Sequence, residues 1–285
     1  MKNRLFLFIV LLLPLQLSAQ KGLLWEISGN GLEKSSFLFG TIHVICQDDY
    51  FEPEGFTEAL KSSSAICLEI DVSDPQMGAK MQKVLIDPQM RNVKDELDPA
   101  AVAGVDSLMR KYMMAGIDKL GILKPWAIAT TFSILTMLDC PAQKQYETEL
   151  AMLARQEEKP ILALETIEFQ TSLFDSWERA DQVQMINELI LEKEKNRQLF
   201  RRLFACYRLQ DLEALLQLTL EQTEYVKYNK ALLDDRNTSW IPLMKGMMQQ
   251  QSVFFGVGAA HLGGSNGVIN LLRGAGYTVE PFTVK

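Results

Sequence analysis

The chain has 285 residues, of which 47% are hydrophobic and 23% charged, and its formal net charge is −7. The negative charge argues against nucleic acid and anionic membrane surfaces as partners. The length allows one large domain with a full hydrophobic core or two smaller ones. Since no Pro/Gly/Ser-rich linker and no repeat divides the sequence, we expect a single domain over residues 20–285.

Residues 1–19 have the pattern of a secretory signal peptide. Lys2 and Arg4 form a basic start, residues 5–17 form an apolar stretch, and small residues precede a cleavage site after Ala19. A retained membrane anchor is the alternative, but the apolar stretch is shorter than the ~20 residues that span a bilayer. We therefore expect an exported protein, periplasmic or secreted, with no stable membrane insertion after cleavage.

The sequence contains four cysteines, and their spacing matches no zinc or redox CxxC pattern. An exported protein can form disulfides, but the order of the cysteines does not decide their pairing. Free buried thiols with one bridge at most are the simpler interpretation. The cysteines are Cys46, Cys67, Cys140 and Cys206.

The first predicted elements are two short strands that flank a helix. Residues 36–44 and 65–71 are apolar, rich in β-branched or aromatic residues, and too short for stable helices. Residues 53–62 fit one short helix between them. A strand, a helix and a strand in this order indicate a βαβ unit with parallel strands.

A long helical region follows, from about residue 76 to residue 250. Charged residues alternate there with Leu, Met and Ala at helical spacing. Pro125 suits the first turn of a helix that continues through residues 126–137, because proline needs no N–H partner at that position. One strand, at residues 160–166, interrupts this region.

The C-terminal region returns to strand patterns. We expect a strand at residues 252–261, a glycine-rich turn, a helix at about 265–273 and a last strand at 277–284. The predicted fold class is α/β. It has a small, mainly parallel central sheet built from both chain ends, and a large helical insertion of a size that suits a cap.

The chain contains two histidines, and both end a predicted strand in the same local pattern. Gly40 precedes His43 by three positions, and Gly258 precedes His261 by three positions. A lone histidine is most often a structural residue, but the repeated Gly-x-x-His pattern at equivalent places indicates a functional site. Each glycine is explained by close backbone approach or by a tight strand end.

Carboxylates follow two of the other predicted strands. Glu69 and Asp71 share one face at the end of the second strand, and Glu165 ends the third. Ligands bind parallel α/β sheets beyond the carboxyl ends of the strands, so we expect Glu69 and Glu165 to meet His43 and His261 there. Of the two neighbouring carboxylates, Glu69 is predicted to face the cleft, because the strand is expected to turn away after Asp71.

Two kinds of chemistry fit this set. Imidazole nitrogens with carboxylates suit Mn²⁺, Fe²⁺, Co²⁺ or Zn²⁺, and a metal site with an open position lowers the pKa of bound water to ~7. The predicted metal ligands are His43, His261 and Glu69. A histidine and a glutamate in one cleft can also act as general base and acid without a metal.

At these residues the chain resembles the TraB/GumN family, which includes the Tiki proteases and is related in fold to erythromycin esterase and the ChaN-like proteins. The resemblance extends from about Leu24 to Phe282. It is carried by FLFGTIHV at 37–44, CLEID at 67–71, LKPWA at 123–127, PILALET with Gln170, Arg236-Asn237 with Trp240, and VGAAHLGGSNGVINLLRGAGYTVEPF at 257–282.

The resemblance implies that His43, Glu69 and His261 are active-site residues and that Arg236 is a polar neighbour. Members of the family often have Gly-x-Asp where this chain has Gln145-Tyr146-Glu147, so the carboxylate is kept and the glycine is not. The Tiki branch implies a metal-dependent peptidase.

The sequence therefore predicts an exported, metal-assisted hydrolase that acts on a peptide or a related amide or ester bond in a peptide or small-molecule substrate. In this prediction Glu69 is a metal ligand or the general base, and Glu165 and Arg236 orient the substrate or the neighbouring groups. The alternatives are a binding protein for haem or another small ligand, as the ChaN-like relatives imply, and a metal-free His/Glu esterase.

Overall fold

The computed structural model describes residues 21–138, 140–221 and 223–284. The predicted signal peptide at residues 1–19 lies outside the described residues. A six-stranded sheet with the order β6-β4-β7-β2-β1-β8 forms the centre of the described chain. Its strands are β1 (Leu24–Ser28), β2 (Ser36–Thr41), β4 (Ala65–Leu68), β6 (Ile161–Ala163), β7 (Val253–Gly258) and β8 (Thr278–Pro281).

Four neighbouring strands of the sheet run parallel. β7 pairs in parallel with both β2 and β4, and β4 pairs in parallel with β6. The ladder between β2 and β7 places Thr41 opposite Gly258, so the two Gly-x-x-His segments leave the sheet side by side. The carboxyl ends of all four strands therefore lie at one edge. The prediction of a mainly parallel α/β sheet built from both chain ends is confirmed.

The structure corrects two details of the predicted topology. The strand β1 was not predicted; it pairs antiparallel with β2 and with β8. Residues 29–35 connect β1 to β2, and the loop begins with three positive φ angles, which Gly29, Asn30 and Gly31 adopt more readily than other residues. In addition, β7 lies between the two strands of the predicted βαβ unit. Those strands are parallel but not adjacent, because the C-terminal strand enters between them.

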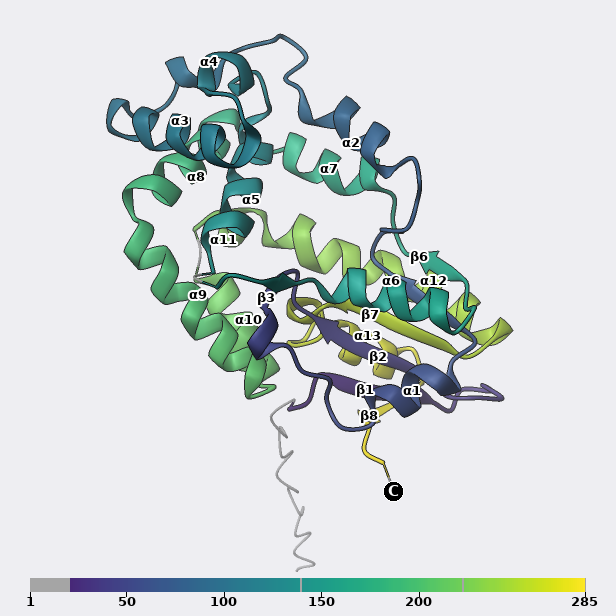
Figure 1. Cartoon of the computed structure of the whole chain (residues 1–285). Helices are drawn as coiled ribbons and strands as arrows, with labels where there is room; N and C mark the ends of the chain where they lie inside the picture. Colours follow the sequence, from purple (N-terminus) through teal and green to yellow (C-terminus); the bar gives the residue numbers. More distant parts are fainter. Residues whose placement is uncertain (1–20, 139, 222, 285) are drawn as a thin grey trace, which may run out of the picture.

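Helices make up most of the chain between β4 and β7, as predicted. Figure 1 shows α3, α4, α5 and α8 gathered at the end of the molecule away from the sheet. The helices in chain order are α1 (Phe56–Ser62), α2 (Met77–Leu85), α3 (Pro99–Met113), α4 (Ile117–Leu120), α5 (Pro125–Thr136), α6 (Tyr146–Gln156), α7 (Ile167–Asp175), α8 (Arg179–Leu191), α9 (Lys193–Arg208), α10 (Leu212–Leu220), α11 (Thr223–Asn229), α12 (Asp235–Gln250) and α13 (Val268–Gly274).

The helical insertion has a hydrophobic core of its own. The large core surrounds the sheet, with Phe39, Phe254 and Trp240 among its fully buried side chains. A second core joins α3, α4, α5 and α8 around Val105 and Phe132. Burial of such apolar side chains stabilises the insertion by about 25 cal/mol for each Å² removed from water. The insertion is thus held by its own packing as well as by its contacts with the sheet.

Candidate active site

The predicted site residues are all placed at the carboxyl edge of the parallel strands. His43 follows the end of β2, Glu69 follows β4 directly, and Glu165 comes shortly after β6. His261 ends a short 3-10 turn, η4 (Ala259–His261), that follows β7. This placement agrees with the general rule for open parallel sheets, in which ligands bind beyond the carboxyl ends of the strands.

The two glycines of the Gly-x-x-His segments allow close approach. A Cβ at Gly40 would lie 3.1 Å from both the Cα and the Cβ of Ala259, so a side chain there would push the two segments apart. A Cβ at Gly258 would lie 3.3 Å from Oε1 of Glu69, the same oxygen that accepts a hydrogen bond of 2.8 Å from the Gly258 N–H. Both positions therefore favour glycine for reasons of space.

Arg236 is the centre of the hydrogen-bond network. It lies on α12 directly after a π-helical turn, η3 (Lys230–Asp234), a feature that is frequent at functional sites. Its Nη2 donates to Oε2 of Glu69 at 2.6 Å and to Oε2 of Glu165 at 2.9 Å. Its Nε donates to Glu165, and Nη1 bonds to the Leu232 carbonyl and to Nε2 of His261. All donor groups of this buried guanidinium have partners.

The two carboxylates share a second donor besides Arg236. Nε2 of Gln170 donates to Oε2 of Glu69 at 3.1 Å and to Oε2 of Glu165 at 3.0 Å. Glu165 also accepts a bond of 2.7 Å from the indole of Trp240, and its side chain is 4% exposed. The side chain of Glu69 is 12% exposed. Glu69 is therefore the more exposed of the two carboxylates, and Glu165 fixes Arg236.

Glu69 is ionised in this setting. Burial raises the pKa of its carboxyl group, and a protonated His261, Arg236, a protonated His43 and the backbone N–H of Gly258 lower it. With His261 neutral, the charges of Arg236 and His43 and the Gly258 N–H remain, and they keep the pKa below its usual range. The neighbouring Asp71 takes no part in the network, because its Oδ1 accepts hydrogen bonds from the backbone N–H and the hydroxyl of Ser73. Of the two predicted candidates, Glu69 is the one that faces the cluster.

His261 is buried and neutral, with a defined tautomer. Arg236 can only donate, so Nε2 of His261 accepts the bond of 3.1 Å from it. The amide Nδ2 of Asn237 donates to the Asn266 carbonyl, which turns Oδ1 of Asn237 toward Nδ1 of His261 at 2.6 Å. The proton of the ring is therefore on Nδ1. Burial lowers the pKa of His261 to about 3, and the charge of Arg236 adds to this effect.

His43 has the opposite surroundings. Its side chain is 71% exposed, and Nδ1 lies 3.3 Å from Oε1 of Glu147 at the start of α6. The hydroxyl of Thr41 donates to the same oxygen at 2.8 Å. The hydrogen bond and the charge of Glu147 raise the pKa of His43 to about 9. The charges of Glu69 and Arg236 also act on His43, so the exposed pair and the buried cluster are electrostatic neighbours.

The predicted metal ligands are only partly brought together. Nε2 of His261 lies 3.9 Å from Oε1 of Glu69, but His43 is bonded to Glu147. Within the described ranges, no three His, Cys, Asp or Glu side chains form a group that could hold a metal ion. The imidazole and carboxylate donors are of the types that suit a borderline divalent ion. Their arrangement is not that of a bound metal, because the lone pair of Nε2 of His261 accepts a hydrogen bond from Arg236.

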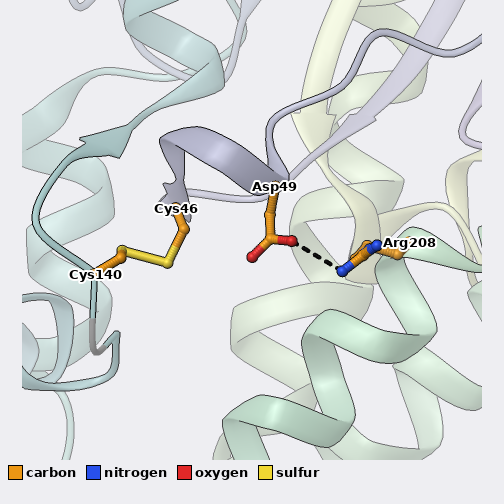
Figure 2. The surroundings of a disulfide bond; sticks show 4 residues. All are labelled: Cys46, Asp49, Cys140 and Arg208. Atoms are coloured by element: carbon orange, nitrogen blue, oxygen red, sulfur yellow. Dashed lines mark hydrogen bonds and ion pairs between the residues drawn. A yellow bond between two sulfur atoms is a disulfide. The ribbon is translucent and has the colours of Figure 1, made fainter.

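One disulfide links the two segments that carry the exposed pair. Cys46 bonds to Cys140, and Figure 2 shows this bridge next to the ion pair of Asp49 and Arg208. Cys67 is buried and free, and Cys206 is half-buried and free. The order of the four cysteines in the sequence leaves their pairing open, and the structure pairs Cys46 with Cys140.

Several side chains of the site were not assigned a role from the sequence. Gln170, Asn237 and Trp240 stand in the quoted family segments, yet nothing in their residue types indicates hydrogen bonds to a carboxylate or an imidazole. Glu147 was noted as a retained carboxylate, and its place in the Gly-x-Asp position of the family was the one available signal. These side chains reach the carboxylates and the histidines because the fold places α6, α7 and α12 around the edge of the sheet.

Comparison with known proteins identifies the family of the chain. The chain is 23% identical over 310 residues to a protein of Danio rerio named Metalloprotease TIKI1; the match covers 90% of this chain and 62% of that protein. The chain thus corresponds to less than two thirds of that relative's length. No solved structure matches significantly. The model of the TraB/PrgY/gumN family matches residues 23–281, nearly the full described length, and the chain belongs to this family.

Proposed function

We propose that the protein is a hydrolase that cleaves a peptide bond or a related amide or ester bond, with Glu69 as its central reactive carboxylate. The observation that carries this proposal is the pairing of an ionised, partly accessible Glu69 with a neutral His261 whose Nε2 lies 3.9 Å away. An ionised carboxylate next to a neutral imidazole can accept and return a proton during hydrolysis. The relative named as a metalloprotease supports the class of reaction.

The remaining polar residues position these two groups. Arg236 has all its donors engaged, so it orients Glu69 and Glu165 and offers the substrate no free N–H. Asn237 holds the proton of His261 on Nδ1, so Nε2 is the basic nitrogen of the ring, and it can take part in proton transfer once Arg236 releases it. The exposed His43 faces solvent beside Glu147, where it can contact a substrate and transfer a proton.

We further propose that a divalent ion, Mn²⁺, Fe²⁺, Co²⁺ or Zn²⁺, is held by His43, His261 and Glu69. Such an ion, when bound, would polarise the scissile carbonyl and activate a water. The donor chemistry fits, and for the ion to bind, Arg236 must release Nε2 of His261. Metal-free acid–base catalysis by the same residues is the second candidate. It is favoured by the contact of His43 with Glu147 and not with His261.

The proposal includes export to an oxidising compartment. The disulfide between Cys46 and Cys140 supports it, because such bonds persist mainly in secreted and periplasmic proteins. No helix in the described part of the chain is long and apolar enough to cross a membrane. A free peptide or small molecule is the proposed substrate, and the negative net charge argues against nucleic acid.

Melting curves with and without a chelator, together with elemental analysis of tag-free protein, test the metal. An ion bound only by the native state stabilises it by RT ln(1 + [L]/Kd), about 2.7 kcal/mol at a hundredfold excess over Kd. We expect the chelator to lower the melting temperature of the wild type, and His43→Ala and His261→Ala each to remove most of this sensitivity.

The same sample tests the reaction and the haem alternative. A mixed peptide library and small aryl esters, followed by mass spectrometry, are expected to give products with the wild type and not with Glu69→Gln. An unchanged melting curve with retained hydrolysis would favour the metal-free mechanism. A Soret absorbance band in the purified protein with no hydrolysis would favour the haem-binding alternative.

A further inference from the structure

The disulfide connects the two segments that carry His43 and Glu147. Cys46 lies three positions after His43, on β3 (Ile45–Cys46). Cys140 lies shortly before β5 (Gln143–Lys144), which leads into α6 and Glu147. The bond joins positions 94 residues apart in the sequence. It is therefore the covalent link closest to the exposed pair of the candidate site.

The non-covalent link between the same segments is short. β3 and β5 form a separate two-stranded sheet with two paired positions, Ile45 with Lys144 and Cys46 with Gln143. One further backbone bond, from the Gln47 N–H to the Ala142 carbonyl at 3.0 Å, extends this ladder. An isolated two-stranded ribbon is marginally stable by itself. Side-chain contacts of Tyr50 with Lys144 and of Phe51 with Tyr146 add to this pairing, and the disulfide is its covalent constraint.

The geometry of the exposed pair depends on this ribbon. The side chain of His43 is 71% exposed, so packing fixes it little, and its bond to Glu147 has a length of 3.3 Å. Glu147 itself is anchored by Thr41 and by the buried face of α6. A small shift of His43 relative to α6 would therefore break its contact and leave Glu147 in place.

The fold around the ribbon does not depend on the disulfide in the same way. Val44 and Ile45 are 4% and 1% exposed, and Tyr146, at the start of α6, is fully buried. This packing keeps both segments on the sheet after reduction. Opening of the disulfide is expected to loosen the ribbon without unfolding the protein.

A reductant can reach the bridge from a cavity. Cys46 lines a cavity of about 270 Å³, and the wall opposite is formed by α9. The lining includes Arg197, Arg201 and Arg208 from that helix, and Asp49, which pairs with Arg208 at 2.8 Å. The arginines outnumber the acidic residue of the lining, and positive charge near a disulfide favours the thiolates that attack it and leave it.

We propose that the Cys46–Cys140 disulfide is a positioning element that holds His43 against Glu147, and that its reduction by a dithiol separates the pair and lowers the activity of the site. The loss of activity on reduction rests on the proposed function, whereas the positioning of His43 does not. In the reaction, one thiolate of the dithiol attacks a cysteine sulfur, the S–S bond breaks, and the second thiol closes the reductant into its own disulfide. Two electrons and two protons pass from the dithiol to the cysteines.

Proton NMR of the histidine rings tests the positioning directly. The chain has two histidines, so His261 is an internal control for His43. On reduction with dithiothreitol we expect the ring signals of His43 to move to the positions seen in Glu147→Gln, and those of His261 to stay in place. Cys46→Ser/Cys140→Ser is expected to match the reduced wild type, and Cys206→Ser the oxidised one.

Reoxidation and hydrolysis complete the test. We expect reoxidation to restore the His43 signals. Reduction is expected to lower hydrolysis by the wild type at least tenfold. Oxidised Cys206→Ser is the control, and its hydrolysis is expected to equal that of the oxidised wild type. Unchanged His43 signals in protein with four free thiols would overturn the inference, and so would global unfolding on reduction seen by circular dichroism. If the oxidised wild type shows no hydrolysis, the proposed function fails, while the NMR result still decides the positioning role.

Discussion

The two Gly-x-x-His segments leave adjacent parallel strands with the same local sequence pattern, yet their histidines have opposite chemistry. His261 is 5% exposed, and both of its ring nitrogens have protein partners. The side chain of His43 is 71% exposed, and its partner is a single carboxylate. Burial and the sign of the nearest charge lower the pKa of the first histidine and raise that of the second.

This difference divides the site into a fixed part and an adjustable part. Around His261, the bonds of Arg236 to Glu69 and Glu165 form a network in which every charge is paired, and such a network is costly to disturb. Around His43, one exposed ion pair contributes little to stability and can change with pH or redox state. The predictions below test that division.

The largest expected effect is on activity and concerns the carboxylate in the fixed part. Glu69→Gln keeps the size of the side chain but removes the charge, and loss of an acid–base group typically lowers the rate by about 10²–10⁴-fold. Asp71→Asn is the matched control, since the hydrogen bonds described for the side chain of Asp71 go only to Ser73. Product formation from the peptide library measures both. Full activity of Glu69→Gln with loss in Asp71→Asn would reverse the assignment.

The second expected effect is on stability and concerns the buried guanidinium. Arg236→Met removes the cation and leaves Glu69 and Glu165 buried beside each other, which should cost about 3–5 kcal/mol of unfolding free energy. Arg202→Met is the control, because Arg202 forms an exposed pair with Glu221 that is worth at most ~1 kcal/mol. Urea denaturation measures the two variants. Equal losses would mean that the buried network contributes no more than a surface pair.

The sequence allowed the sheet edge to be predicted, because strand ends are short-range features. The apolar runs at 36–44, 65–71 and 252–261 are visible in the sequence, and parallel strands bring their ends to one edge. The strands themselves end three residues earlier, at Thr41, Leu68 and Gly258. The order of the strands was not predictable in the same way. The insertion of β7 between β2 and β4 depends on long-range pairing that no local pattern encodes.

The partners of the site residues were harder to predict for a related reason. Glu147 and Gln170 come from helices whose approach to the sheet is set by packing over the whole insertion. The local sequence shows that α6 and α7 are helices, but not which of their residues face His43 or Glu69. The exposed state of His43 and the buried state of His261 follow from that packing and not from their shared motif.

The third expected effect is a loss of stability in acid that originates from His261. Its pKa is lowered from 6.5 to about 3, so below pH 6.5 the unfolded chain takes up a proton that the native state does not bind. Stability from this residue is therefore lost as pH falls from 6.5 toward 3, by up to about 1.4 kcal/mol per pH unit. His261→Gln should reduce the slope of unfolding free energy between pH 6.5 and 4.5. An identical slope in wild type and variant would contradict a neutral, buried His261.

The smallest expected effect has the opposite sign and originates from His43. Its pKa is raised from 6.5 to about 9 by Glu147, so the native state holds a proton that the unfolded chain releases above pH 6.5. The stabilisation is fully present below pH 6.5 and is lost as pH rises toward 9. Because the ring is 71% exposed, water screens the pair and the slope is expected to be a small fraction of that for His261.

Urea denaturation of chelator-treated, oxidised protein between pH 6.5 and 8.5 measures the slope that originates from His43. His43→Gln and Glu147→Gln should flatten this slope equally, since each removes the same interaction, whereas His261→Gln should leave it unchanged above about pH 7.5, where His261 is neutral in both the native and the unfolded state. A flattened slope in His43→Gln but not in Glu147→Gln would show that another carboxylate holds the proton on His43.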